Sequence, residues 1–137
     1  MKLYITMILD TNSHSVFLLN YHLVMVTKYR CEVFDDEVSD AAKSIFERIG
    51  DSYKIELIEW NHDKDHIHVL FKAHPKTEIS KFINAYKSAS SRLLKKDYPK
   101  IKEKLWESKF WSQSFCLITT GGAPLDVIKQ YVIDQGQ

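Results

Sequence analysis

Two histidines separated by one residue are the part of this sequence best suited to chemistry. His66 and His68 lie in the apolar, β-branched run of residues 65–71. Alternate side chains of a strand point to opposite faces, so both imidazoles should project from one face and the apolar residues from the other, toward packing helices. Those apolar residues are Ile67, Val69 and Phe71. Because imidazole is the commonest metal ligand, the pair predicts a metal clip on the face opposite the helices; satisfied core histidines fit about equally well.

A second candidate pair lies near the end of the sequence. Tyr131 and Gln135 are four residues apart, so in a helix opened by Pro124 and Leu125 they stand one turn apart on one face. The apolar stripe of this helix, over residues 125–134, passes to one side of Tyr131. The hydroxyl can therefore reach a site, although an amphipathic tyrosine at the rim of a packed helix is the alternative.

Positive charge is concentrated in one segment. Residues 81–109 contain nine lysines and arginines against three acidic residues, whereas the whole chain has a formal charge of +1. Such a local excess suits a polyanion, and a solvated helix face explains it about as well. The candidate residues for contacts with such a polyanion are Lys87, Arg92, Lys95 and Lys96, with Lys28 and Arg30 as weaker candidates.

The periodicities predict an α+β fold in a single domain over residues 1–137. Strands are expected at 16–27, 53–60, 65–71 and 110–120. Helices are expected at 38–49, with Asp35-Asp36-Glu37 as the acidic start of the helix, at 77–97, with Thr77 as the cap, and at 125–134. The first strand is apolar on both faces at its centre, so it should lie inside the sheet. This order matches the ferredoxin-like, split βαβ arrangement, a four-stranded antiparallel sheet with helices on one face.

Composition places the protein among ordinary globular chains. Apolar residues make up 45% and charged residues 27%. Cys31 and Cys116 lack the spacing of a metal knuckle or a disulfide framework, which fits a reducing compartment. No stretch approaches membrane-spanning length, so we expect a cytoplasmic protein without a membrane partner.

Four motifs in this order resemble the HUH-superfamily single-tyrosine transposases (TnpA type) of the smallest bacterial and archaeal insertion sequences. The name HUH denotes His-hydrophobic-His, with Ile67 as the hydrophobic member. The motifs are Tyr21-His22-Leu23-Val24 through Thr27-Lys28-Tyr29-Arg30, His66-Ile67-His68 after Asp63-Lys64-Asp65, Gly121-Gly122-Ala123-Pro124-Leu125, and Lys129-Gln130-Tyr131 with Gln135.

The resemblance implies a homodimer that binds single-stranded DNA hairpins at the ends of the element and cuts and rejoins strands. It further implies a 5′-phosphotyrosine intermediate, a divalent metal and no need for ATP. Transferred to this sequence, His66, His68 and Gln135 would be metal ligands, and Tyr131 would be the nucleophile. Two imidazoles and an amide oxygen suit Mg²⁺ or Mn²⁺ better than Zn²⁺, because neither a thiolate nor a carboxylate completes a closed tetrahedral site.

Three other functions remain compatible with the same residues. A domesticated relative that acts on chromosomal repeats would carry the same catalytic groups. A non-catalytic single-strand binder would stack bases on aromatic side chains and hold phosphates with lysines, but it leaves both candidate pairs unexplained. A replication initiator or plasmid nickase shares the histidines and the tyrosine, although such enzymes usually contain further domains.

Overall fold

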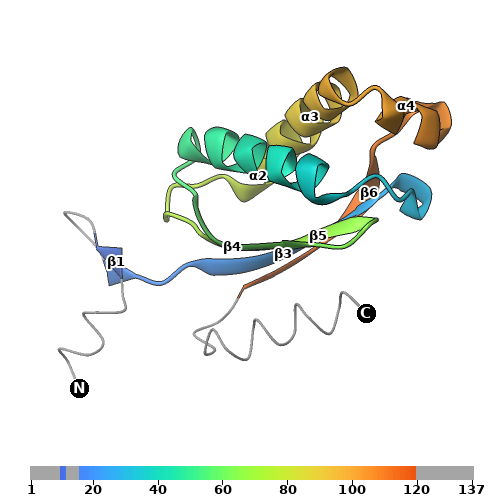
Figure 1. The fold of residues 1–137 in the computed structure, drawn as a ribbon. Helices are drawn as coiled ribbons and strands as arrows, with labels where there is room; N and C mark the ends of the chain where they lie inside the picture. Colours follow the sequence, from blue (N-terminus) through green and yellow to red (C-terminus); the bar gives the residue numbers. More distant parts are fainter. Residues whose placement is uncertain (1–9, 12–15, 120–137) are drawn as a thin grey trace.

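The computed structural model of the chain describes residues 10–11 and 16–119 (Figure 1). The predicted last helix, with Tyr131 and Gln135, lies outside the described residues. The strands are β1 (Asp10–Thr11), β2 (Val16–Phe17), β3 (Asn20–Thr27), β4 (Glu56–His62), β5 (His66–Lys72) and β6 (Trp111–Thr119). The helices are α2 (Asp36–Asp51), α3 (Ile79–Asp97) and α4 (Lys100–Lys104), with single 3-10 turns η1 (Lys28–Arg30) and η2 (Trp106–Ser108).

Four strands form an antiparallel sheet in the order β4-β5-β3-β6. Helices α2 and α3 lie side by side on one face of this sheet (Figure 1). The predicted α+β, ferredoxin-like architecture is therefore confirmed, and β3 is an interior strand as its apolar centre indicated. The sheet places β5, the strand that carries both histidines, between β3 and β4.

The core fills the layer between the sheet and the two helices. Phe46 of α2 packs edge-on against Phe82 and Tyr86 of α3, with ring centroids 5.0 and 5.2 Å away. Ile67, Val69 and Phe71 are fully buried and belong to this core. The predicted facing of β5 is therefore confirmed, and His66 and His68 point to the opposite face.

The start of the first helix was predicted correctly, and the start of the second was not. Asp35 caps α2 by accepting a 2.8 Å hydrogen bond from the backbone N–H of Val38. Thr77 does not cap α3, because its hydroxyl donates to the carbonyl of Tyr53 and accepts from the N–H of His74. The side chain is thus engaged with the chain before the helix, and α3 starts at Ile79.

Three predicted boundaries differ from the structure. The run 16–27 is broken: Val16–Phe17 pairs with Asp10–Thr11 in a separate two-stranded sheet, and β3 begins at Asn20. The strand predicted at 53–60 is displaced to 56–62, because residues 52–54 still belong to the turn after α2 and Lys54 has a φ of 58°. The lysine-rich connector after α3 contains α4, which the sequence pattern did not indicate.

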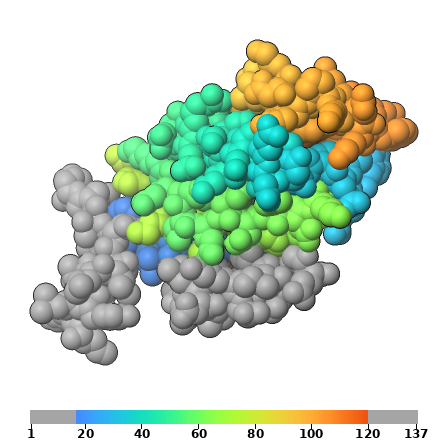
Figure 2. Space-filling view, in the orientation of Figure 1, coloured from blue at the N-terminus to red at the C-terminus, as the bar shows by residue number. Residues whose placement is uncertain are grey.

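The helices form the surface on one side of the sheet. Figure 2 shows α2 in cyan, with the orange end of α3 and α4 above it. At the right-hand end this orange segment meets the blue segment that contains η1 (Figures 1 and 2).

Within the described residues, the helices fall short of the length and apolarity required to cross a membrane.

Candidate active site

The two predicted histidines form a buried pair on the face of β5 opposite α2 and α3. Their ring centroids are 4.6 Å apart, with the ring planes inclined by 84°. Each residue is only 5% exposed. The rings are held side by side because strand alternation places positions 66 and 68 on one face and the neighbouring strands fix the backbone.

A carboxylate immediately before the pair fixes the orientation of the first histidine. Nδ1 of His66 lies 2.5 Å from Oδ1 of Asp65, and Nε of Arg30 lies 2.7 Å from the other oxygen, Oδ2. Burial acts to raise the pKa of Asp65, but the hydrogen bonds from Arg30 and His66 outweigh it, so the pKa is lowered from its ordinary value. An ionised carboxylate only accepts hydrogen bonds, so Nδ1 of His66 carries the proton and Nε2 presents a lone pair.

The second histidine is kept neutral by its surroundings. Burial, followed by the positive potentials of His66 and His22, lowers the pKa of His68 to about 4. His68 is therefore a neutral imidazole near neutral pH, the form that binds a metal ion. His22 lies on the same sheet face, because it pairs with Leu70 while Val24 pairs with His68.

Two members of this neighbourhood were not predicted as site residues. Asp65 could have been identified from its position directly before His66 at the start of a strand, where an Asp-His pair places a carboxylate beside the ring. His22 lies within a motif used for the family resemblance, but its proximity to His68 depends on the pairing of β3 with β5.

A pocket of about 350 Å³ opens beside the pair. It is lined by Val24 and Val26 of β3, by Ser114, Phe115 and Cys116 of β6, and by Arg30 and His66. Cys116 is a free, exposed thiol at this wall. The pocket gives the site an approach from the β6 side and places the Arg30 guanidinium at its edge, where an anion would be favoured.

One direct observation indicates that the two histidines suit a divalent cation. Nε2 of His66 and Nδ1 of His68 are buried and have no hydrogen-bond partner among the described residues. A buried polar atom without a partner is costly, and a cation would satisfy the His66 lone pair. No cluster of three His, Cys, Asp or Glu side chains suited to a metal ion occurs in residues 10–11 and 16–119. The described part therefore supplies two of the predicted ligands, and the third, Gln135, lies outside it.

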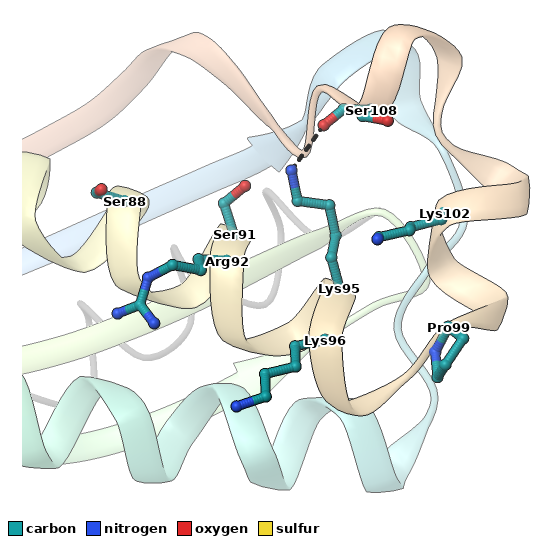
Figure 3. Close-up of a pocket in the computed structure, with 8 residues that line it drawn as sticks. All are labelled: Ser88, Ser91, Arg92, Lys95, Lys96, Pro99, Lys102 and Ser108. Carbon is teal, nitrogen blue, oxygen red and sulfur yellow. Dashed lines mark hydrogen bonds between the residues drawn. The ribbon is translucent and has the colours of Figure 1, made fainter.

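The predicted DNA-binding residues fall in two different places. Arg92, Lys95 and Lys96 line a hollow of about 700 Å³ between α3, α4 and η2, together with Lys102 (Figure 3). Lys102 extends toward the Lys95 side chain, and the Lys95 ammonium donates to the Ser108 carbonyl at 2.9 Å (Figure 3). We call this feature the basic hollow.

Lys87 is not part of the basic hollow. Its ammonium donates to the carbonyl of Gln113 at 3.1 Å and lies 5.5 Å from the ring centroid of Phe115, and burial lowers its pKa. This lysine fastens α3 to β6. Lys28 and Arg30 lie in η1, where Arg30 is already engaged by Asp65.

Comparison with known proteins gives a consistent result. The chain matches the family described as "Transposase IS200 like" over residues 15–135. It is 37% identical over 120 residues to the ISDra2 transposase TnpA of Deinococcus radiodurans, covering 88% of this chain and 86% of that relative. It is also 29% identical over 109 residues to the transposase for insertion sequence element IS200 of Salmonella typhimurium, covering 80% and 72% respectively.

Solved structures share the fold. The crystal structure of a candidate transposase from Deinococcus radiodurans R1 matches with a TM-score of 0.74 and 33% identity, covering 92% of this chain and 97% of that one. A REP-associated tyrosine transposase bound to a REP hairpin matches with a TM-score of 0.62 and 9% identity, covering 90% and 67%. The second similarity concerns the fold alone.

Proposed function

Because the chain belongs to the family of IS200-like transposases, we propose that it cleaves and rejoins single-stranded DNA at His66 and His68 with Tyr131 as the nucleophile. The observation that carries this proposal is the His66–His68 pair, in which Asp65 holds His66 and buried ring nitrogens lack partners. A single-strand binder leaves this buried arrangement unexplained. A strand-cleaving enzyme can use it to hold a metal ion against a phosphate.

The nucleophile follows from the residue type and the family. The phenol oxygen of Tyr131 attacks phosphorus, the P–O3′ bond breaks, and the phosphate remains on the tyrosine as a 5′-phosphotyrosine. The phenolic proton is lost, and the departing 3′ oxygen is protonated. Attack by a 3′-hydroxyl on the phosphotyrosine then reseals a strand, so the bond energy is conserved and no ATP is consumed.

His66, His68 and Gln135 would hold Mg²⁺ or Mn²⁺. When bound, such an ion supplies Lewis-acid stabilisation of the charge on the phosphate oxygens. The task of Asp65 is to keep the proton on Nδ1 of His66, so that Nε2 stays available. The low pKa of His68 keeps that ring neutral near neutral pH.

The DNA ligand we propose is a hairpin with single-stranded flanks. The basic hollow provides four cationic side chains for phosphates: Arg92, Lys95, Lys96 and Lys102. The hairpin in the structure of the REP-associated transposase, which has the same fold, supports a structured DNA ligand. Within the described residues, β6 pairs only with β3, so its outer edge offers backbone groups to a partner strand, and we propose a homodimer.

The test is a nicking assay on single-stranded DNA taken from the flanks of the gene. Cleavage should require Mg²⁺ or Mn²⁺ and should stop on chelation. His66→Ala and His68→Ala should each reduce cleavage by orders of magnitude, whereas Lys43→Ala, on the exposed side of α2, should leave it unchanged. Metal-independent cleavage, or full activity in the histidine variants, would refute the proposed site.

A further inference from the structure

Two aromatic side chains meet in the solvent at the end of the sheet that holds His66. Tyr29 of η1 is 58% exposed and Trp106 of η2 is 59% exposed. Their ring centroids are 5.3 Å apart and their planes are inclined by 77°. Among the described residues, the only other large apolar side chains that are exposed are Phe115 and Ile118, and each has a smaller exposed fraction than Tyr29 or Trp106. Burial in the core therefore does not explain where these two rings lie.

The two turns that carry these rings contain residues in an unfavourable backbone conformation, Tyr29 itself in η1 and the residue after Trp106 in η2. Five non-glycine residues of the described chain have positive φ, and four of them form these two turns: Tyr29, Arg30, Glu107 and Ser108. Side-chain-bearing residues in this region are strained, and such residues concentrate at functional sites. Four of the five such residues therefore lie in the two turns that carry the exposed rings.

The turns do not need the ring contact to stay in place. The N–H of Lys28 donates to the carbonyl of Phe110 at 2.8 Å, which fastens η1 to the start of β6. The ammonium of Lys95 donates to the carbonyl of Ser108, which fastens η2 to α3. Because other bonds fix both turns, the rings are available for a ligand.

The aromatic pair connects the basic hollow to the histidines. Ser108, two residues after Trp106, lines the basic hollow. Arg30, next to Tyr29, is bonded to Asp65, which in turn accepts from His66. A strand that places phosphates in the basic hollow and another phosphate at the histidines would therefore pass over the two rings.

The charges beside the rings suit a nucleic acid. The Lys28 ammonium lies 5.1 Å from the ring centroid of Tyr29. The acidic group nearest to Trp106 in sequence, Glu107, is paired with Lys109 at 3.6 Å. Bases stack on aromatic faces without regard to sequence, and cations beside the face hold the adjoining phosphates.

We propose that Tyr29 and Trp106 form a stacking site for an unpaired base of the DNA strand, between the basic hollow and the histidines. This inference rests on the proposed action on single-stranded DNA and adds a contact to the base itself. The two rings, 77° apart, present differently directed faces, so one base stacks on one ring and touches the edge of the other.

The test compares two probes of equal charge. One is a 20-mer of thymidylate, and the other is a 20-mer of the same backbone in which the bases are replaced by abasic residues. The wild-type protein should bind the thymidylate strand about fivefold to a hundredfold more tightly than the abasic strand, since one stacked base contributes on that scale. Tyr29→Leu and Trp106→Leu should reduce this preference, whereas Tyr29→Phe and Trp106→Phe, which keep a ring, should retain it.

A cross-linking experiment locates the contact. A thymidylate 20-mer that carries 5-iododeoxyuridine is irradiated in complex with the protein, and the cross-linked residue is identified by mass spectrometry. We expect the cross-link at Tyr29 or Trp106. The leucine variants should keep the slope of log affinity against log salt, because no phosphate contact is lost. They should also keep the wild-type thermal unfolding profile, since both side chains are more than half exposed.

The outcomes separate this inference from the proposed function. If the wild type binds both probes equally, or if the leucine variants keep the base preference, the stacking site is refuted while cleavage at the histidines stands. If the leucine variants change the sedimentation coefficient and not the base preference, the rings belong to a contact between two copies of the chain, which also refutes the inference. A wild-type protein that binds neither probe would likewise refute the stacking site, whereas the absence of metal-dependent nicking of the gene's flanks would contradict the proposed function itself.

Discussion

Oδ1 of Asp65 lies 2.5 Å from Nδ1 of His66, and this contact decides which nitrogen of the ring is left for a metal. Asp65→Ala removes the acceptor, so the proton of His66 is free to move to Nε2 and the ring to rotate. We expect the affinity for Mn²⁺ to fall about tenfold to a hundredfold, as is usual when the partner of a metal-binding histidine is lost.

The measurement is Mn²⁺ binding by electron paramagnetic resonance in a Tyr131→Phe background, which is independent of cleavage. Nitrogen-15 shifts of the apo protein should show the His66 proton on Nδ1 in the parent and a mixture in the variant. Asp40→Asn is the control, because Asp40 is an exposed carboxylate of α2, which covers the other face of the sheet. Unaltered Mn²⁺ affinity in Asp65→Ala would exclude a role for this carboxylate.

The low pKa of His68 makes stability depend on pH. Between about pH 6.5 and 4, the unfolded chain binds a proton at this residue that the folded chain does not, so stability is complete above about pH 6.5 and decreases as the pH falls to 4. The shift corresponds to a loss on the order of 3 kcal/mol.

Urea unfolding from pH 7 to 4, with chelator present, tests this dependence. His68→Gln should flatten the curve over that window, and the difference between the two curves isolates His68 from the carboxylates that also titrate there. Parallel curves for the two proteins would show that the folded and unfolded chains protonate His68 alike.

The cations of the basic hollow should bind phosphates, each independently of base sequence. Neutralising Arg92, Lys96 or Lys102 with glutamine should lower the slope of log affinity against log salt by roughly one unit per phosphate contact. Lys87→Gln should change the slope less, because its ammonium is fastened to Gln113 and lies on the Phe115 ring. Lys43→Gln on α2 is the matched control, and equal slopes in all variants would identify the hollow as a solvated surface.

Sequence patterns predicted the features that depend on the alternation of side chains along one strand. They did not predict contacts between segments that are distant in the sequence. The facing of His66 and His68 follows from the two-residue period of one strand, and it was predicted correctly. The bond from Arg30 to Asp65 joins residues 35 positions apart, so no local pattern indicates it. For the same reason Lys87 was grouped with Lys95, although only the placement of β6 shows that Lys87 is engaged elsewhere.

The predicted boundaries of strands and turns were wrong for a related reason. The run 16–27 is uniformly suited to a strand, and its interruption depends on which partner each half finds, Asp10–Thr11 or β5 and β6. The strained turns η1 and η2 are not marked by glycine, the usual signal of positive φ, so neither they nor the Tyr29–Trp106 contact could be predicted.

In the proposed reaction Tyr131 becomes covalently joined to the 5′ side of the cut strand. The most direct measurement is mass spectrometry of the denatured, nuclease-trimmed and proteolysed product after incubation with single-stranded DNA from the gene's flanks and Mn²⁺. We expect one nucleotide-bearing peptide, modified at Tyr131, and no adduct from a Tyr131→Phe protein that still binds the same DNA. An adduct at another residue, or an undiminished adduct in Tyr131→Phe, would contradict it.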